Sequence, residues 1–246
     1  LPIGSPTPAP TNTPDLSEAF AQCQAELNYL YTQASDACLG QPTGYFCNGG
    51  LPPRAEPMGA ISNQMAVVGS LVEVGLIDRV NPAPLPSNNS GGIMWMRLRE
   101  PQSVSALLLG DVNITDVTPT DTNLAPWQSI KVETRQYPSD CTSPRSAIII
   151  QGPYGDFGEI IVNGVSLRIN GTVAVETEAN NTEFIALEGR TQLVIYGEGR
   201  TIQAGEQINV TYQEGDFTRP LSFPDAGEPL NFNHIREFPI TLLDRP

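Results

Sequence analysis

Histidine is almost missing from this sequence. His234 is the only one in 246 residues, which excludes a metal centre built on several histidines and a relay between two of them. A Ser/His/Asp hydrolase would have to use His234, and no G-x-S-x-G nucleophile elbow occurs in the sequence. Carboxylates are numerous, but no two of them stand out as a catalytic pair. We therefore expect a protein that is not an enzyme and that uses no cofactor.

Basic residues and long apolar runs are also scarce. Thirteen Lys and Arg stand against 27 Asp and Glu, a net charge of −14, which argues against a nucleic-acid partner because such a partner needs a basic surface. No run approaches the roughly 20 apolar residues of a membrane span. A Pro/Thr-rich tail begins at Leu1, without a charged-then-apolar signal segment. We expect a processed, secreted protein, extracellular or at the cell surface.

Cysteine is limited to four positions, Cys23, Cys38, Cys47 and Cys141, without the CxxC spacing of a zinc site. An even number in an exported protein predicts two disulfides. Cys23 and Cys38 would lie about 22 Å apart in one helix, too far for a bond. Two connectivities remain: Cys23–Cys47 with Cys38–Cys141, or Cys38–Cys47 with Cys23–Cys141. We favour the first, because nine extended residues can return along the helix by up to about 30 Å.

Apolar residues recur at helical spacing from Leu16 to Cys38, with Ser17 or Asp15 available as the cap, which predicts one helix. Downstream, short β-rich runs recur every 8 to 12 residues with Gly and Asn between them. This spacing is typical of a sandwich, a barrel or a short solenoid. Residues 59–77, GAISNQMAVVGSLVEVGLI, are compatible with a second helix, but their Val, Ile and Gly content favours strands.

The predicted fold is therefore mainly β, with a disulfide-stapled N-terminal helix followed by a β-sandwich or short β-solenoid and with extended arms at both ends. We expect four segments: an extended Pro/Thr-rich arm at 1–16, a helix plus β region stapled by disulfides at 17–141, a β-domain at 142–215 and a Pro-punctuated strap at 216–246.

The β-domain carries a recognisable series of strands and turns: GTVAVET, then ALEG, QLVIYG and QAGEQINV. Over about residues 145–215 this series resembles the FecR-like extracellular β-domain. The upstream Cys-bearing helix and LLLGDVNITD resemble the N-terminal part of uncharacterised secreted bacterial proteins that carry such a domain. The resemblance implies export, β architecture and no catalytic residues. FecR regulators also have a membrane span and a cytoplasmic sigma-factor-interacting part, neither of which this sequence shows, so transmembrane signalling is not expected.

The stretch GDVNITDVTPTD offers the hard oxygen ligands that calcium prefers. Its candidates are Asp111, Asn113, Asp116 and Asp121. Their spacing does not match the calcium-loop pattern D-x-[DN]-x-[DN]-G. We favour a solvated acidic loop over a calcium site, and predict no bound metal.

The alternating segment 93–99 offers a candidate binding surface. One face carries Met94, Met96 and Leu98, and the other carries Trp95, Arg97 and Arg99. An aromatic ring beside two guanidinium groups can anchor a partner chain or stack on a glycan. The alternative is that Trp95 faces the core.

The opening arm has almost no apolar surface of its own apart from Leu1 and Ile3. Its prolines, among them Pro6, Pro8 and Pro10, lack amide donors, so the arm can bind only as an extended or edge segment. We expect these five residues to dock on a neighbouring subunit, which makes the protein a homo-oligomeric subunit of an extracellular filament or surface layer. The alternative is a monomeric, glycan-binding or adhesive module at the cell surface.

Overall fold

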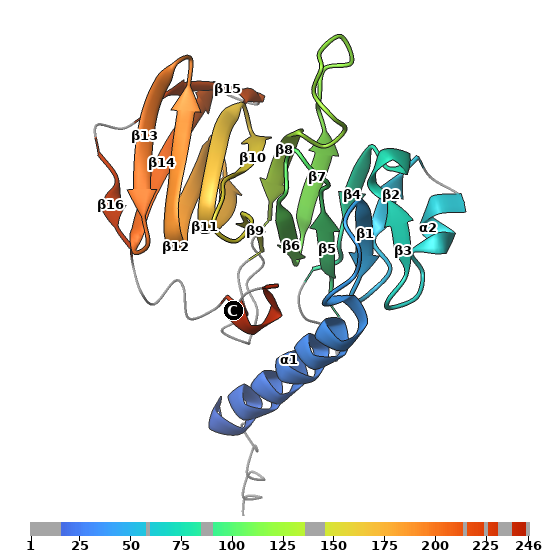
Figure 1. Ribbon diagram of the computed structural model, residues 1–246. Coiled ribbons are helices and arrows are strands. Elements are labelled where there is room, and N and C mark those ends of the chain that lie inside the picture. Colours follow the sequence, from blue (N-terminus) through green and yellow to red (C-terminus); the bar gives the residue numbers. More distant parts are fainter. Residues whose placement is uncertain are drawn as a thin grey trace, which may run out of the picture.

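The computed structural model describes residues 16–57, 60–84, 91–135, 146–213, 216–223, 226–230 and 238–244. The protein is mainly β with one long helix near its N-terminus, as the sequence predicts. This helix, α1 (Leu16–Cys38), agrees with the predicted bounds. The strands that follow form one continuous, branched sheet (Figure 1). No helix in these ranges combines the length and the apolar character needed to cross a membrane.

The sheet branches at two long strands, β11 (Val165–Glu178) and β12 (Asn181–Ile195), which pair with each other. On the other edge of β11, its second half pairs with β9 and its first half with β10. Layer A continues through β9 (Ala147–Gln151), β6 (Ser105–Leu109), β5 (Ile93–Arg97), β1 (Tyr45–Asn48) and β3 (Leu71–Glu73). Layer B continues through β10 (Gly158–Val162), β8 (Ser129–Thr134), β7 (Val112–Asp116), β4 (Arg79–Asn81) and β2 (Arg54–Glu56).

Strand β12 divides between the layers in the same way. Its first half pairs with β14 (Glu206–Gln213), which also pairs with β15 (Asp216–Ser222) and β16 (Glu228–Pro229) and extends layer A. Its second half pairs with β13 (Glu198–Gln203) and extends layer B. The pairings β6–β9 and β8–β10 cross the boundary predicted between residues 141 and 142. The layers therefore run without interruption from the N-terminal region into the predicted β-domain.

Two facing glycines allow β11 and β12 to pass from one layer to the other. Gly171 and Gly189 are register partners, with φ of +132° and +65°. A Cβ on either glycine would lie 2.1 Å from a backbone carbonyl oxygen of the opposite strand. Glycine is the residue that permits so close an approach at a sheet corner. In the sequence, Gly171 and Gly189 separate short β-rich runs. In the structure, these runs belong to two continuous strands that bend at the glycines.

The inward side chains of both layers form one apolar core. Trp127, which the sequence analysis did not single out, lies completely buried in this core. Its ring packs edge-on against Phe46 with a centroid distance of 4.9 Å. Its Nε1 donates to the carbonyl oxygens of Val74 at 2.8 Å and Ile77 at 2.9 Å. Trp127 thus ties layer B to the β3 edge of layer A.

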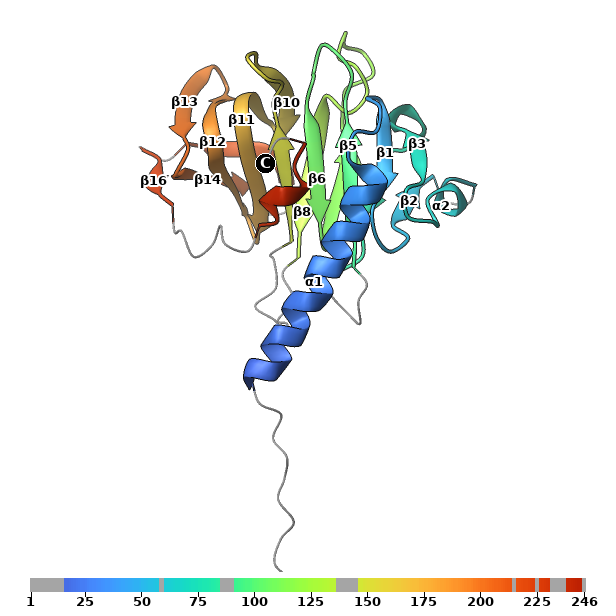
Figure 2. The ribbon, with the colours of Figure 1, turned by 60° about the horizontal axis from the view of Figure 1, so that its bottom comes forward.

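A second apolar cluster covers the outer face of layer A. The second half of α1 contributes Leu30 and Ala34, and the C-terminal segment around η2 (Ile240–Leu242) contributes Phe238 and Leu242. Figure 2 shows α1 and the red C-terminal segment against the same face. The molecule therefore has three levels: the helix with the C-terminal segment, layer A, and layer B. Of the segment predicted as a C-terminal strap, residues 238–244 lie against this face, and its first part forms β15.

The first half of α1 projects beyond the strands (Figures 1 and 2). Packing of α1 against other elements involves β1, β5 and η2. With 23 residues, the helix is about 34 Å long at 1.5 Å per residue. Its N-terminal end therefore lies far from the end that joins β1.

The favoured disulfide connectivity is wrong. Cys38 is bonded to Cys47, with a Cα–Cα distance of 5.8 Å. The chain turns after α1 through Gly40 and Gly44, both with positive φ, so β1 starts beside the last turn of the helix and need not return along it. The exclusion of a Cys23–Cys38 bond is confirmed. The side chain of Cys23 and the whole of Cys141 lie outside the described residues.

The prediction of strands for residues 59–77 is wrong in its first part. The chain forms a short helix, α2 (Ala60–Gln64), before the predicted strand character appears in β3. The side-chain amide of Asn48 donates to the carbonyl oxygen of Met65 at 2.8 Å, which satisfies an acceptor at the end of this helix. Residues Val74–Leu76 then form a single 3-10 turn, η1.

Candidate functional site

The structure corrects the predicted role of Trp95 as a surface residue. Alternation along β5 holds, because Met94 and Met96 lie in the core between the layers and Trp95 points to the other side. That other side is covered by α1 and the C-terminal segment, so Trp95 is only 1% exposed. Its Nε1 donates to the carbonyl oxygen of Leu242 at 3.2 Å. Trp95 therefore holds the C-terminal segment and offers no surface to a glycan or a partner.

Arg97 is also buried, at 5% exposure. Its guanidinium donates through Nε and Nη2 to the two carboxylate oxygens of Asp244, with an Nε–Oδ2 distance of 3.0 Å. A bidentate pair of this kind fixes both groups in orientation as well as in distance. The pair therefore anchors Asp244, the second residue after η2, at the end of β5.

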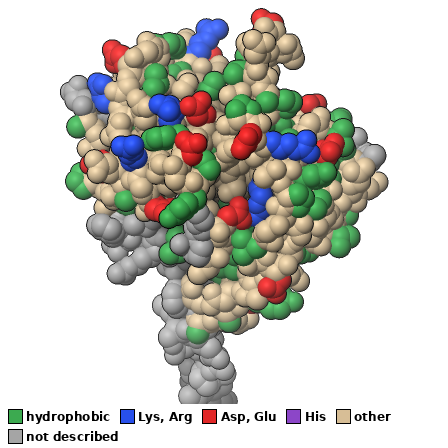
Figure 3. Space-filling view, viewed as in Figure 1, with side chains coloured by type: hydrophobic (Ala, Val, Ile, Leu, Met, Phe, Trp, Pro, Cys, Tyr) green, Lys and Arg blue, Asp and Glu red, His purple; other side chains and the backbone are tan. Residues whose placement is uncertain are grey.

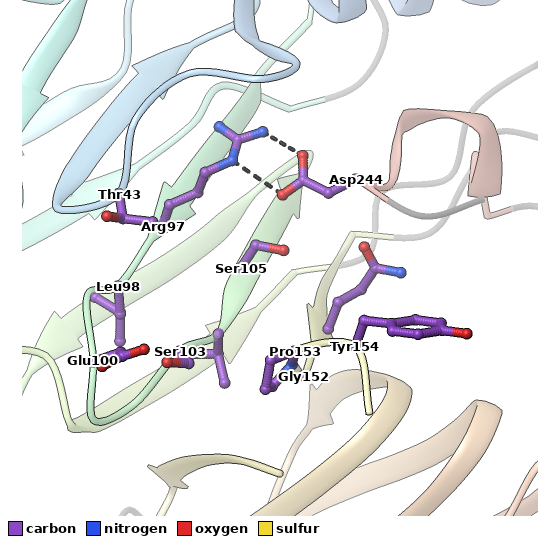
Figure 4. Close-up of a pocket in the computed structure, with 12 residues that line it drawn as sticks. Thr43, Arg97, Leu98, Glu100, Ser103, Ser105, Gly152, Pro153, Tyr154 and Asp244 are labelled. Atoms are coloured by element: carbon purple, nitrogen blue, oxygen red, sulfur yellow. Dashed lines mark hydrogen bonds and ion pairs between the residues drawn. The ribbon is translucent and has the colours of Figure 1, made fainter. Parts of the chain in front are cut away.

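The Arg97–Asp244 pair forms one wall of a groove at the ends of β5, β6 and β9. The groove has a volume of about 540 Å³, within the range of ligand sites. Residues from strand ends and from connections line it: Thr43, Arg97, Ser103, Ser105, Tyr154 and Asp244 (Figure 4). We call this the Tyr154 groove. Tyr154 is 90% exposed, the highest value among the large apolar and aromatic side chains that the structure describes.

Three hydroxyl groups add to the polar character that Glu100 and the Arg97–Asp244 pair give the groove. They belong to Thr43 in the α1–β1 connection, Ser103 in the β5–β6 loop and Ser105 at the start of β6. None of the three side chains forms a hydrogen bond with another described residue. The side-chain amide of Gln151, by contrast, donates to the hydroxyl oxygen of Thr172 at 3.0 Å. The groove therefore combines hydrogen-bond donors that are available to a ligand with an exposed aromatic ring.

Arg99 does not reach the Tyr154 groove. It is exposed and lines a separate hollow of about 300 Å³ with Glu73, Glu100 and Pro126. The three residues predicted to share one binding face are thus divided: Trp95 under the C-terminal segment, Arg97 in the groove wall and Arg99 in the neighbouring hollow. The remaining predicted interface residues, Leu1, Ile3, Pro6, Pro8 and Pro10, lie outside the described residues, as does His234.

The candidate calcium ligands are used in other ways. Asp111 accepts a hydrogen bond from the amide of Asn81 at 2.8 Å. The carboxylate of Asp116 accepts the backbone N–H groups of Thr118 at 2.9 Å and Trp127 at 3.0 Å. These residues belong partly to β7 and not to one loop. Within the described ranges, no group of three or more His, Cys, Asp or Glu could hold a metal ion.

Comparison with known proteins does not assign this chain to a family. Two crystal structures from Parabacteroides distasonis, both provisionally described as an anti-sigma factor, are similar to it. One matches with a TM-score of 0.35 and 11% identity over 60% of each chain. The other matches with a TM-score of 0.31 and 13% identity over 51% of this chain and 54% of its own. The matches therefore span less than two thirds of either structure. No family profile and no curated protein matches the sequence.

Sequence reasoning did not identify Tyr154, Ser105 or Asp244 as members of one site. They belong to the β9–β10 connection, the start of β6 and the C-terminal segment, and only the folded layers bring them together. A usable signal was the sequence GPYGD at 152–156, where an aromatic residue stands between turn residues. An aromatic residue in such a loop has no core to enter.

Proposed function

We propose that the protein is a secreted, non-enzymatic subunit of an extracellular filament or surface layer, joined to its neighbour by the N-terminal arm. The observation that carries this proposal is the projection of α1 (Figure 1). The arm is attached to Leu16, at the end of the helix that lies away from the β layers. A segment placed in this way is suited to contact a second molecule.

The β body has the properties that such a subunit needs. Its interior is continuous through both layers, and the outer face of layer A is already covered by parts of the same chain. The Cys38–Cys47 disulfide supports secretion, because disulfides persist in oxidising compartments. Within the part of the chain that the structure describes, the body thus shows no large apolar face that depends on the arm for cover.

We further propose that residues 142–215 are a FecR-like extracellular β-domain. The support lies in the order of its tight turns. Asn163–Gly164 and Tyr196–Gly197 have positive φ at both positions, the geometry of two-residue hairpins between β10 and β11 and between β12 and β13. The AGEQ turn then joins β13 to β14. Gly164 and Gly197 thus lie in hairpin turns, whereas Gly171 and Gly189 lie at bends within β11 and β12 and β14 pairs with β12 instead of β13. This regular placement of glycines supports the proposed resemblance.

Electron microscopy of the purified protein tests the proposed assembly. Full-length protein should form regular polymers, and deletion of residues 1–14 should abolish them while the body stays folded and disulfide-bonded. Replacement of both Leu1 and Ile3 by Asp should have the same effect, because burying an unpaired carboxylate is unfavourable. Polymers of normal appearance from the truncated protein, or dispersed full-length monomers at high concentration, would refute the proposal.

A further inference from the structure

We infer that the Tyr154 groove is the receptor for the N-terminal arm of a second copy of this chain. The inference rests on the proposed assembly and names the acceptor site within it. Three observations carry it: the hydrogen-bonding chemistry of the arm, the matching chemistry of the groove, and the opposite placement of the two along α1.

The arm is rich in hydrogen-bond acceptors and poor in donors. Five of residues 1–15 are proline, and proline has a carbonyl oxygen but no backbone N–H. Proline-rich segments favour the extended polyproline II conformation, which leaves the carbonyl groups exposed and forms no internal hydrogen bonds. Binding such a segment requires donors and flat apolar surfaces, and its preformed shape lowers the entropy lost on binding.

The groove offers these features. Thr43, Ser103 and Ser105 supply hydroxyl donors that form no hydrogen bond with other described residues. The ring of Tyr154 supplies an exposed aromatic face on which a proline ring can pack. Among the described lining residues, the single arginine, Arg97, is neutralised by Asp244, and Glu100 adds a negative charge, so the site does not favour an anion. A neutral, proline-rich peptide fits these properties better than an anionic ligand does.

The groove and the point where the arm is attached lie at opposite ends of α1. Thr43, in the groove wall, follows the last residue of the helix, Cys38, by five positions. The arm leaves from the first residue of the same helix, about 34 Å away at 1.5 Å per residue. A donor at one end of a molecule and an acceptor at the other produce a head-to-tail contact, which gives open fibres unless rotation closes a ring. This arrangement is the one that the proposed filament requires.

Peptide binding tests the groove directly. A synthetic peptide of residues 1–14 should bind the protein that lacks those residues, and Tyr154→Ala should weaken this binding at least tenfold. Tyr196→Ala is the matched control, because Tyr196 is also exposed, at 78%, but lies in the β12–β13 turn. Both variants should keep the melting temperature of the parent protein. A second variant, Ser105→Trp, should block the groove by size and also weaken binding at least tenfold.

The outcomes separate the groove from the wider proposal. If arm deletion abolishes polymers but Tyr154→Ala and Ser105→Trp polymerise and bind peptide normally, the arm docks elsewhere and the groove assignment is wrong. If full-length protein forms no polymers, the proposed assembly fails and the groove assignment fails with it. If a neutral oligosaccharide binds in a Tyr154-dependent manner and the peptide does not, the groove is a glycan site and the inference is overturned.

Discussion

The outer faces of the two layers differ sharply, although both belong to the same branched sheet. In layer A, β5 and β9 are buried at every position because α1 and the C-terminal segment cover them. In layer B, β10 alternates between buried and exposed positions. Its outer face carries ion pairs such as Arg168–Glu159, at 3.0 Å with both side chains about half exposed. Figure 3 shows basic and acidic side chains close together over β10, β11 and β12.

This difference shows that the pattern of apolar and polar residues along a strand indicates whether one or both faces of the sheet are covered. Continuous apolar runs such as AIIIQ in β9 belong to strands with both faces buried, whereas GEIIV in β10 alternates. Strand β5, IMWMR, is of the first kind in spite of its arginine. Arg97 is accommodated because Asp244 pairs with it.

The largest expected effect on stability comes from comparing one substitution on the outer face of layer A with one on the outer face of layer B. Trp95→Ala should lower the free energy of unfolding by about 3–5 kcal/mol, because it leaves a cavity under the C-terminal segment. Gln192→Ala, on the outer face of layer B, should change it by less than about 0.5 kcal/mol. Denaturant unfolding measures both. Equal effects would mean that the outer face of layer A is not the covered face described here.

The next effect concerns the strands that join the layers. Gly189→Ala should destabilise the protein by about 2–4 kcal/mol, from the left-handed backbone and from contact with the carbonyl oxygen of Asn170. Gly197→Ala is its control, because Gly197 also has positive φ but no atom within 4 Å of a new Cβ. This control should cost only about 1–2 kcal/mol. A loss at Gly189 no larger than at Gly197 would argue against the close crossing of β11 and β12.

The smallest expected effects compare one ion pair from each face. Asp244→Ala should cost about 1.5–3 kcal/mol, because the buried guanidinium of Arg97 loses its charged partner. Glu159→Ala should cost less than about 1 kcal/mol, because its pair with Arg168 is half exposed and solvent screens it. Thermal melting of the two variants side by side checks the ranking. The reverse order would contradict the burial assigned to Arg97.

The spacing of apolar residues predicted the helix α1 and the alternation in β5, but it did not predict which other parts of the chain pack against them. The bounds of α1 and the alternation of Met94, Trp95 and Met96 follow from local spacing, and the structure confirms both. The burial of Trp95 depends on Leu242, which is 147 residues away in the sequence. No local pattern reports such a contact. The Tyr154 groove is hidden for the same reason, because its residues come from connections that are far apart in the sequence.

The disulfide shows a related limit. Helix geometry correctly excluded a bond between Cys23 and Cys38, but the choice between the remaining connectivities depended on the path of the chain after α1. The glycines at 40 and 44 turn the chain at once, so Cys47 meets Cys38. The number of residues between Cys38 and Cys47 is also large enough for the chain to run back along the helix to Cys23, so loop length alone could not decide between the two connectivities.

The most direct test of the account is the length of polymers grown with truncated subunits. A subunit without residues 1–14 keeps the Tyr154 groove, so it can accept an arm from a neighbour, but it has no arm to donate. Added to full-length protein in increasing proportion, it should terminate growth and shorten the polymers steadily, as measured by electron microscopy. Polymers of unchanged length at equal proportions, with the truncated protein shown to be folded, would contradict a head-to-tail exchange of the arm.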